Sequence, residues 1–131
     1  MSEFLRQQIE EMRAKKVALI YDYDKSEAVN SFTVNNESMW LDKATRVGLV
    51  NSTNVAKANG AENIVLWAND KSYNISCDMM LQMLSVLELY AMECYNVTAQ
   101  HLATVKELED LNRIYNYNYT KGYPKRLNFT V

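Results

Sequence analysis

A seam of apolar and small side chains runs through residues 80–108. Its members follow one another at steps of three or four positions, the spacing that places side chains on one side of a helix. They are Met80, Leu84, Leu87, Ala91, Cys94, Thr98, His101, Val105 and Leu108. The seam predicts one long helix over residues 78–110 with Asp78 as its N-cap. Such a helix would be about 45 Å long, so part of it should lie beside another helix or a partner chain.

The start of the chain predicts an amphipathic helix over residues 2–23. Ser2 is a suitable N-cap, and Glu3 suits the dipole of the first turn. Lys16 interrupts the apolar stripe, whose members are Leu5, Ile9, Met12, Leu19 and Tyr23. We expect this helix to pack on its own domain; because little sequence precedes it, projection as an anchoring or oligomerisation arm is the alternative. The candidate partner-binding residues are Phe4, Leu5, Ile9 and Met12.

Two β-hairpins are predicted after this helix. In the first, Asn35 and Asn36 separate two alternating runs and tolerate the positive φ of a tight turn. The second pairs NIVLWAN with SYNIS across Asp70 and Lys71. We expect both hairpins to join in one small antiparallel sheet of up to four strands, with helix covering at least one face.

A further helix is expected between the hairpins, over residues 43–58. Asp42 is a plausible N-cap, and the pair Asn59 and Gly60 suits a left-handed end. Its basic side chains should form an ordinary solvated outer side. They are Lys43, Arg46 and Lys57.

The C-terminal stretch alternates tyrosines with polar and basic residues, and Gly122 and Pro124 punctuate it. This alternation predicts an extended segment that lays one aromatic row against the domain. Contact with another protein is the main alternative, and aromatic and basic residues together also suit a glycan or single-stranded nucleic acid. The candidate partner-binding tyrosines are Tyr115, Tyr117, Tyr119 and Tyr123.

Composition excludes several classes of protein. A chain of 131 residues with 48% hydrophobic residues and a net charge of −2 is typical of one globular domain, and nucleic acid is not a favoured partner. No apolar run approaches the roughly 18 residues of a membrane span, and the first residues are too polar for a signal peptide. We therefore expect no membrane partner and assembly in a cytoplasm.

No catalytic, cofactor or metal site is expected. Cys77 and Cys94 lack metal-site spacing, so they should be buried thiols. Cys94 and His101 would lie roughly 10 Å apart along one helix, too far for a nucleophile and its base. His101 should instead be a hydrogen-bonded core or interface residue. Four carboxylates should lie on the solvated helix surface: Glu88, Glu93, Glu107 and Glu109.

Several motifs occur in a distinctive order: VNSF before the first turn, MWLDKATRVGL after it, then LELYAMECYN and a closing YTKGYP. Over residues 21–127 the chain resembles a small family of unknown function encoded by phages and prophages, especially those of gut Bacteroidales. The family offers no catalytic residue to carry over, and its members are associated with virion structural genes, often near tail or fibre genes.

The resemblance implies a non-enzymatic structural component of a tailed-phage virion, which joins or decorates capsid, tail or fibre proteins after assembly in the host cytoplasm. The alternative is a tail-fibre assembly chaperone that is absent from the mature particle. Homo-oligomerisation through helices is a further expectation.

The fold class expected from the sequence is α+β, with a small antiparallel sheet from two hairpins packed with a long C-terminal helix and an N-terminal amphipathic helix. We expect two parts: an N-terminal amphipathic helix over residues 1–23, which is a candidate anchoring or oligomerisation arm, and an α+β domain over residues 24–131 that includes the tyrosine-rich segment.

Overall fold

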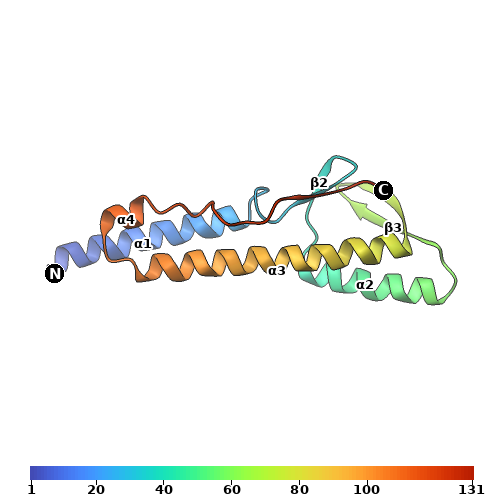
Figure 1. Ribbon diagram of the computed structural model, residues 1–131, viewed down its shortest axis with the longest axis horizontal. Helices are drawn as coiled ribbons and strands as arrows, with labels where there is room; N and C mark the ends of the chain where they lie inside the picture. Colours follow the sequence, from blue (N-terminus) through green and yellow to red (C-terminus); the bar gives the residue numbers. More distant parts are fainter. The chain divides into compact units, whose positions relative to one another are not determined.

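The computed structural model describes residues 1–131 and confirms the α+β class (Figure 1). Its elements follow the order α1 (Glu3–Asp24), β1 (Phe32–Val34), β2 (Glu37–Met39), α2 (Lys43–Ala58), β3 (Asn63–Ala68), β4 (Lys71–Ser76), α3 (Cys77–Glu107), α4 (Leu111–Tyr115) and β5 (Leu127–Phe129). None of the helices combines the length and the apolar character that a membrane span requires.

The chain forms two compact units. The helical unit comprises residues 1–30 and 92–124, and the sheet unit comprises residues 31–91 and 125–131. Helix α3 starts in the sheet unit and continues into the helical unit. This division differs from the expected boundary at residue 23, because α1 packs with α4 inside the helical unit.

In the helical unit, α1 lies alongside the second half of α3 and runs antiparallel to it (Figure 1). The Ser2 hydroxyl accepts a hydrogen bond from the Leu5 amide, which confirms the predicted cap. The inward side of α1 carries Ile9, Lys16 and Ile20. The predicted stripe was therefore wrong in two places: Leu19 is exposed, and Lys16 is buried on the face that it was expected to interrupt.

The sheet unit contains two separate sheets instead of one. The first hairpin has Asn35 and Asn36 at φ 50° and 68°, as predicted. In its sheet the strand order is β2-β1-β5, and β5 pairs in parallel with β1. Strand β5 was not predicted, because its partner strand lies almost a hundred residues earlier in the chain.

The second hairpin, β3 and β4, forms its own two-stranded sheet. Its turn residues are Asn69 and Asp70, at φ 52° and 62°, while Lys71 pairs with Ala68 in the ladder. The predicted turn was thus one residue too late. Asn and Asp accept positive φ more readily than Lys, which accounts for the register.

Helix α2 has the predicted bounds, with Asp42 as N-cap and Gly60 at φ 90° after its end. It runs antiparallel to the first half of α3, as the pairs Arg46 with Glu88 and Lys57 with Asp78 require. The core between helix and sheets is built mainly from Phe32, Val34, Leu66, Ile75, Met80, Met83, Leu84 and Leu87.

The predicted seam of α3 is confirmed. Seven of its members are buried, and Ala91 and Leu108 are half-buried. The helix begins at Cys77 and ends at Glu107, slightly before the predicted end. The predicted Asp78 cap was wrong: Asp78 lies in the first turn, and the Ser76 hydroxyl accepts from the Met79 amide at 3.1 Å. After its end the chain turns into α4, whose N-cap is Asp110, and Arg13 donates a hydrogen bond to the carbonyl of Leu108.

Candidate functional site

The N-terminal partner-binding candidates separate into two groups. Phe4 is 72% exposed and Leu5 is 36% exposed, so both offer apolar surface at the start of α1. Ile9 is only 3% exposed and Met12 is half-buried, so these two pack inside the helical unit. Phe4 and Leu5 alone remain available to a partner.

The tyrosine candidates also separate. Tyr115, at the end of α4, is 67% exposed, whereas Tyr117, Tyr119 and Tyr123 are half-buried. The Tyr23 ring of α1 lies 5.7 Å from the ring centroids of both Tyr119 and Tyr123. Most of the row therefore docks on its own unit, although residues 111–115 form a helix and not the expected extended segment.

Lys16 holds α1 to this tyrosine segment. Its Nζ donates a 2.8 Å hydrogen bond to the Tyr115 carbonyl. The same ammonium lies 5.9 Å from the ring centroid of Tyr115 and 5.6 Å from that of Tyr119. A charge at this buried position is tolerated because a carbonyl and two aromatic faces replace part of its hydration.

A second polar contact joins Asp24, Thr98 and Tyr123. The Thr98 hydroxyl donates to Oδ1 of Asp24 at 2.7 Å and lies 2.6 Å from the Tyr123 hydroxyl. Since the one proton of Thr98 is used, Tyr123 donates to it. The pKa of Tyr123 is raised, mainly by burial. The hydrogen bond with Thr98 lowers this pKa, and the negative charge of Asp24 raises it.

His101 completes this region. Its Nε2 lies 2.8 Å from the Lys121 carbonyl, and its Nδ1 lies 2.6 Å from the Tyr117 hydroxyl. A carbonyl can only accept, so Nε2 carries the proton, and in the neutral ring Nδ1 accepts from Tyr117. The prediction of a hydrogen-bonded core histidine is confirmed.

These contacts form one tyrosine cluster in the helical unit, made of Lys16, Tyr23, Asp24, Thr98, His101, Tyr117, Tyr119 and Tyr123. Lys16, Asp24, Thr98, His101, Tyr117 and Tyr123 are hydrogen-bonded within the unit, and Tyr23 and Tyr119 make ring contacts. Together these contacts hold the segment after α4 against α1 and α3. No group of three or more His, Cys, Asp or Glu side chains is arranged to hold a metal ion. Lys16 and Asp24 were not predicted to take part in this cluster. The helical spacing of Lys16 with Ile9 and Ile20 could have indicated that Lys16 lies on the buried face of α1.

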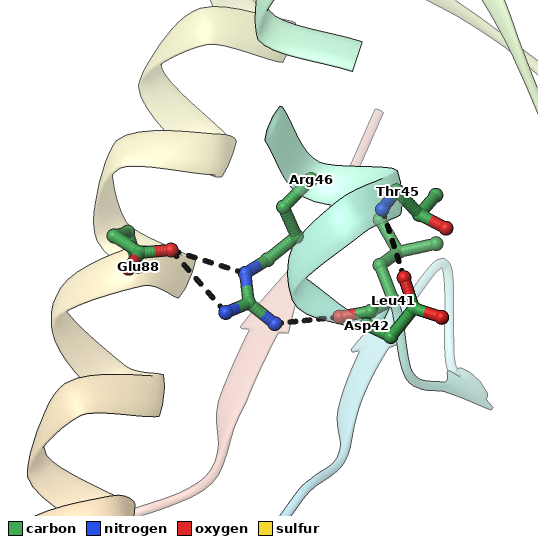
Figure 2. Close-up of polar contacts among 5 residues, drawn as sticks. All are labelled: Leu41, Asp42, Thr45, Arg46 and Glu88. Carbon is green, nitrogen blue, oxygen red and sulfur yellow. Dashed lines mark hydrogen bonds and ion pairs between the residues drawn. The ribbon is translucent and has the colours of Figure 1, made fainter. Parts of the chain in front are cut away.

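A buried arginine organises the sheet unit (Figure 2). Arg46 is 6% exposed, and its Nε and Nη2 both lie 3.2 Å from Oε2 of Glu88. Its Nη1 donates to the Leu41 carbonyl at 2.7 Å, and the Trp40 ring centroid lies 5.3 Å from the guanidinium carbon. The prediction that Arg46 lies on a solvated outer side of α2 was therefore wrong. Glu88, which was expected to be solvated, is paired with it.

The cap beside this arginine is visible in the same view (Figure 2). The Thr45 amide donates to Oδ1 of Asp42 at 2.8 Å. This hydrogen bond is the main reason that the pKa of Asp42 lies below its ordinary value.

One pocket of about 290 Å³ lies near the start of α1. Its lining mixes both signs of charge, with Arg6 and Arg13 opposed by Glu10 and Glu109. Arg6 lies within ion-pair distance of Glu3, and Arg13 binds the Leu108 carbonyl. The arginines therefore have partners within the chain, and the pocket shows no preference for an anion.

Large apolar side chains also remain exposed in the sheet unit. On β3 the inward Leu66 is buried, whereas the outward Trp67 is 70% exposed and Val65 is exposed beside it. On α2 the exposed residues include Val47 and Val55.

Comparison of the chain with protein-family models, curated proteins and solved structures finds no match.

Proposed function

We propose that this chain is a non-enzymatic structural component of a tailed-phage virion that joins or decorates other particle proteins. The observation that carries the proposal is Trp67, which is 70% exposed on the outward face of β3. Tryptophan is among the side chains that contribute most to binding when a partner covers them. The motifs VNSF, MWLDKATRVGL, LELYAMECYN and YTKGYP support the phage assignment through their resemblance to a phage-encoded family.

The helical unit offers two further candidate contacts. Phe4 and Tyr115 are 72% and 67% exposed, and they are separate contacts because Tyr115 lies beside Lys16, twelve residues along α1 from Phe4. Aromatic side chains with an exposed face suit contact with another protein. The partners that fit these side chains and Trp67 are other particle proteins with apolar patches of their own.

Quantitative mass spectrometry of purified particles tests this proposal. The chain is measured relative to the major capsid protein, both in particles of a phage that carries the gene and in infected-cell lysate. A fixed copy number per particle supports a structural role. Absence from particles with abundance in lysate overturns it and favours the alternative, a tail-fibre assembly chaperone.

A variant links that role to the exposed tryptophan. Trp67→Ser removes the aromatic surface and leaves the buried side of β3 unchanged. We expect a lower copy number in particles with an unchanged melting temperature. An unchanged copy number would exclude Trp67 as an attachment residue.

A further inference from the structure

Helix α2 exposes an uncharged face. The residues of α2 that point away from α3 include three valines, of which Val47 is 58% and Val55 is 55% exposed. The other members of the face are Ala44, Val50, Asn51, Asn54 and Ala58, all exposed. A solvated helix face normally carries Lys, Glu or Arg, whereas valine lowers helix propensity.

Gly48 adds a second observation on the same helix. It stands in the helix interior, where glycine is less favourable than alanine. A Cβ atom at this position would meet nothing within 4 Å, so packing inside the chain does not require glycine. A missing side chain on an exposed helix allows a second backbone to approach closely.

The face is symmetric about Asn51. Val47 lies four residues before Asn51 and Val55 four residues after it, and Ala44 and Ala58 stand seven residues away on either side. If two copies of α2 cross antiparallel at Asn51, Val47 of each copy meets Val55 of the other. A two-fold axis requires such self-complementarity, because the same patch serves on both copies.

Charge favours the antiparallel arrangement. A parallel pair would bring Lys43 beside Lys43 of the second copy. In the antiparallel pair, Lys43 lies at the C-terminal end of the opposite helix, where cations are favoured. Lys57 takes no part, because it pairs with Asp78 of its own α3 at 2.6 Å.

From these observations we infer that the exposed face of α2 is a self-association surface, on which a second copy of this chain packs antiparallel with Asn51 on the two-fold axis. This inference does not depend on the virion role. A helix of this length is about 24 Å long. Its single face buries less than the roughly 1,200 Å² of a standard interface, so the dimer is weak and forms at high local concentration.

Cysteine cross-linking tests the axis. The native thiols of Cys77 and Cys94 are buried, so the unmodified chain should give little cross-linked product. Asn51→Cys should form a disulfide dimer under mild oxidation, at least roughly tenfold faster than the control Ser85→Cys, which places a thiol at an exposed position of α3. Equal rates for the two variants would overturn the proposal.

Two further cysteine variants test the direction. Val47→Cys mixed with Val55→Cys should cross-link faster than either variant alone, because position 47 meets position 55 only when the helices are antiparallel. Homodimers of Val47→Cys that form as fast as the mixed dimer would exclude this arrangement. All reduced variants should keep the melting temperature of the unmodified chain, since these positions are exposed.

A charge exchange gives a readout without a covalent bond. Val47→Glu and Val55→Lys should each weaken the dimer about tenfold in sedimentation equilibrium, because each brings one charge against an apolar partner. The double variant should regain most of this loss through two Glu–Lys pairs across the axis. A double variant no stronger than the single variants, or a chain that stays monomeric at millimolar concentration, would overturn the inference.

Discussion

Arg46 and Glu88 form a charge pair in which both the Nε and Nη2 atoms of the arginine lie 3.2 Å from one carboxylate oxygen. The arginine side chain is 7% exposed and the glutamate side chain 41% exposed, so the cation is buried and the anion reaches solvent. This asymmetry means that loss of the two partners should have unequal effects.

Arg46→Ala should lower the free energy of unfolding by about 2–3 kcal/mol, because it leaves the buried Leu41 carbonyl without its donor and removes the contact with Trp40. Glu88→Gln should cost less, since an amide oxygen can still accept from the guanidinium. Urea denaturation of both variants measures the difference. Equal losses would mean that the pair acts through charge alone.

His101 and Tyr117 should be energetically coupled through the 2.6 Å contact between Nδ1 and the phenol hydroxyl. We expect a coupling energy of about 1 kcal/mol in a double-mutant cycle with His101→Phe and Tyr117→Phe. The single change His101→Phe should cost more than Tyr117→Phe, because it also removes the donor to the Lys121 carbonyl. Additive losses would show that this contact contributes nothing to stability.

Lys16 should stabilise the helical unit despite its charge. Lys16→Met keeps the aliphatic stem and removes the hydrogen bond to the Tyr115 carbonyl and the contacts with the two rings. We expect a loss of about 1–2 kcal/mol in the free energy of unfolding. A melting temperature equal to or above that of the unmodified chain would show that the lysine is only tolerated there.

Phe4 and Ile9 should respond differently to polar substitution. Ile9→Ser should lower the free energy of unfolding by about 2–4 kcal/mol because Ile9 is buried, whereas Phe4→Ser should change it by less than about 0.5 kcal/mol. Thermal melting of both variants separates the two effects. If Phe4→Ser instead reduces incorporation into particles, the start of α1 is an attachment surface.

The Asp42 cap should make stability depend on pH. Its folded pKa lies below the ordinary value of 3.8, so its contribution is present above that value and is lost as the pH falls through the folded pKa. Between about pH 5 and about pH 3, the melting temperature of the unmodified chain should fall by more than that of Asp42→Asn. The asparagine can still cap the helix, but it carries no titratable group. Parallel losses in the two chains would assign the acid sensitivity to other carboxylates.

Features that depend on neighbouring residues could be predicted from the sequence. The caps Ser2 and Asp42 act on amides three residues away, and Asn35 and Asn36 adopt their turn because of their own side chains. The seam of α3 could be predicted because a buried helix face repeats at a fixed spacing. These rules need no knowledge of the partner surface.

The division of surface into binding and core residues could be predicted only in part. Exposed Leu5 and buried Ile9 belong to the same expected stripe, and the stripe included exposed Leu19 in place of its buried neighbour Ile20. Periodicity locates a helix face to within about one residue, and the width of the covered strip depends on what packs there.

The sequence by itself determined the three long helices α1, α2 and α3, the first hairpin and the α+β class, because caps, turns and periodic seams act over a few residues. Only the tertiary structure decided that β5 pairs with β1, that the two hairpins lie in separate sheets, and that Lys16 and Arg46 point inward. The physical reason is that a charged side chain or a short strand can be buried only when distant groups supply its hydrogen bonds. For Arg46 the distant group is Glu88, 42 residues away, and for Lys16 it is the carbonyl of Tyr115, 99 residues away.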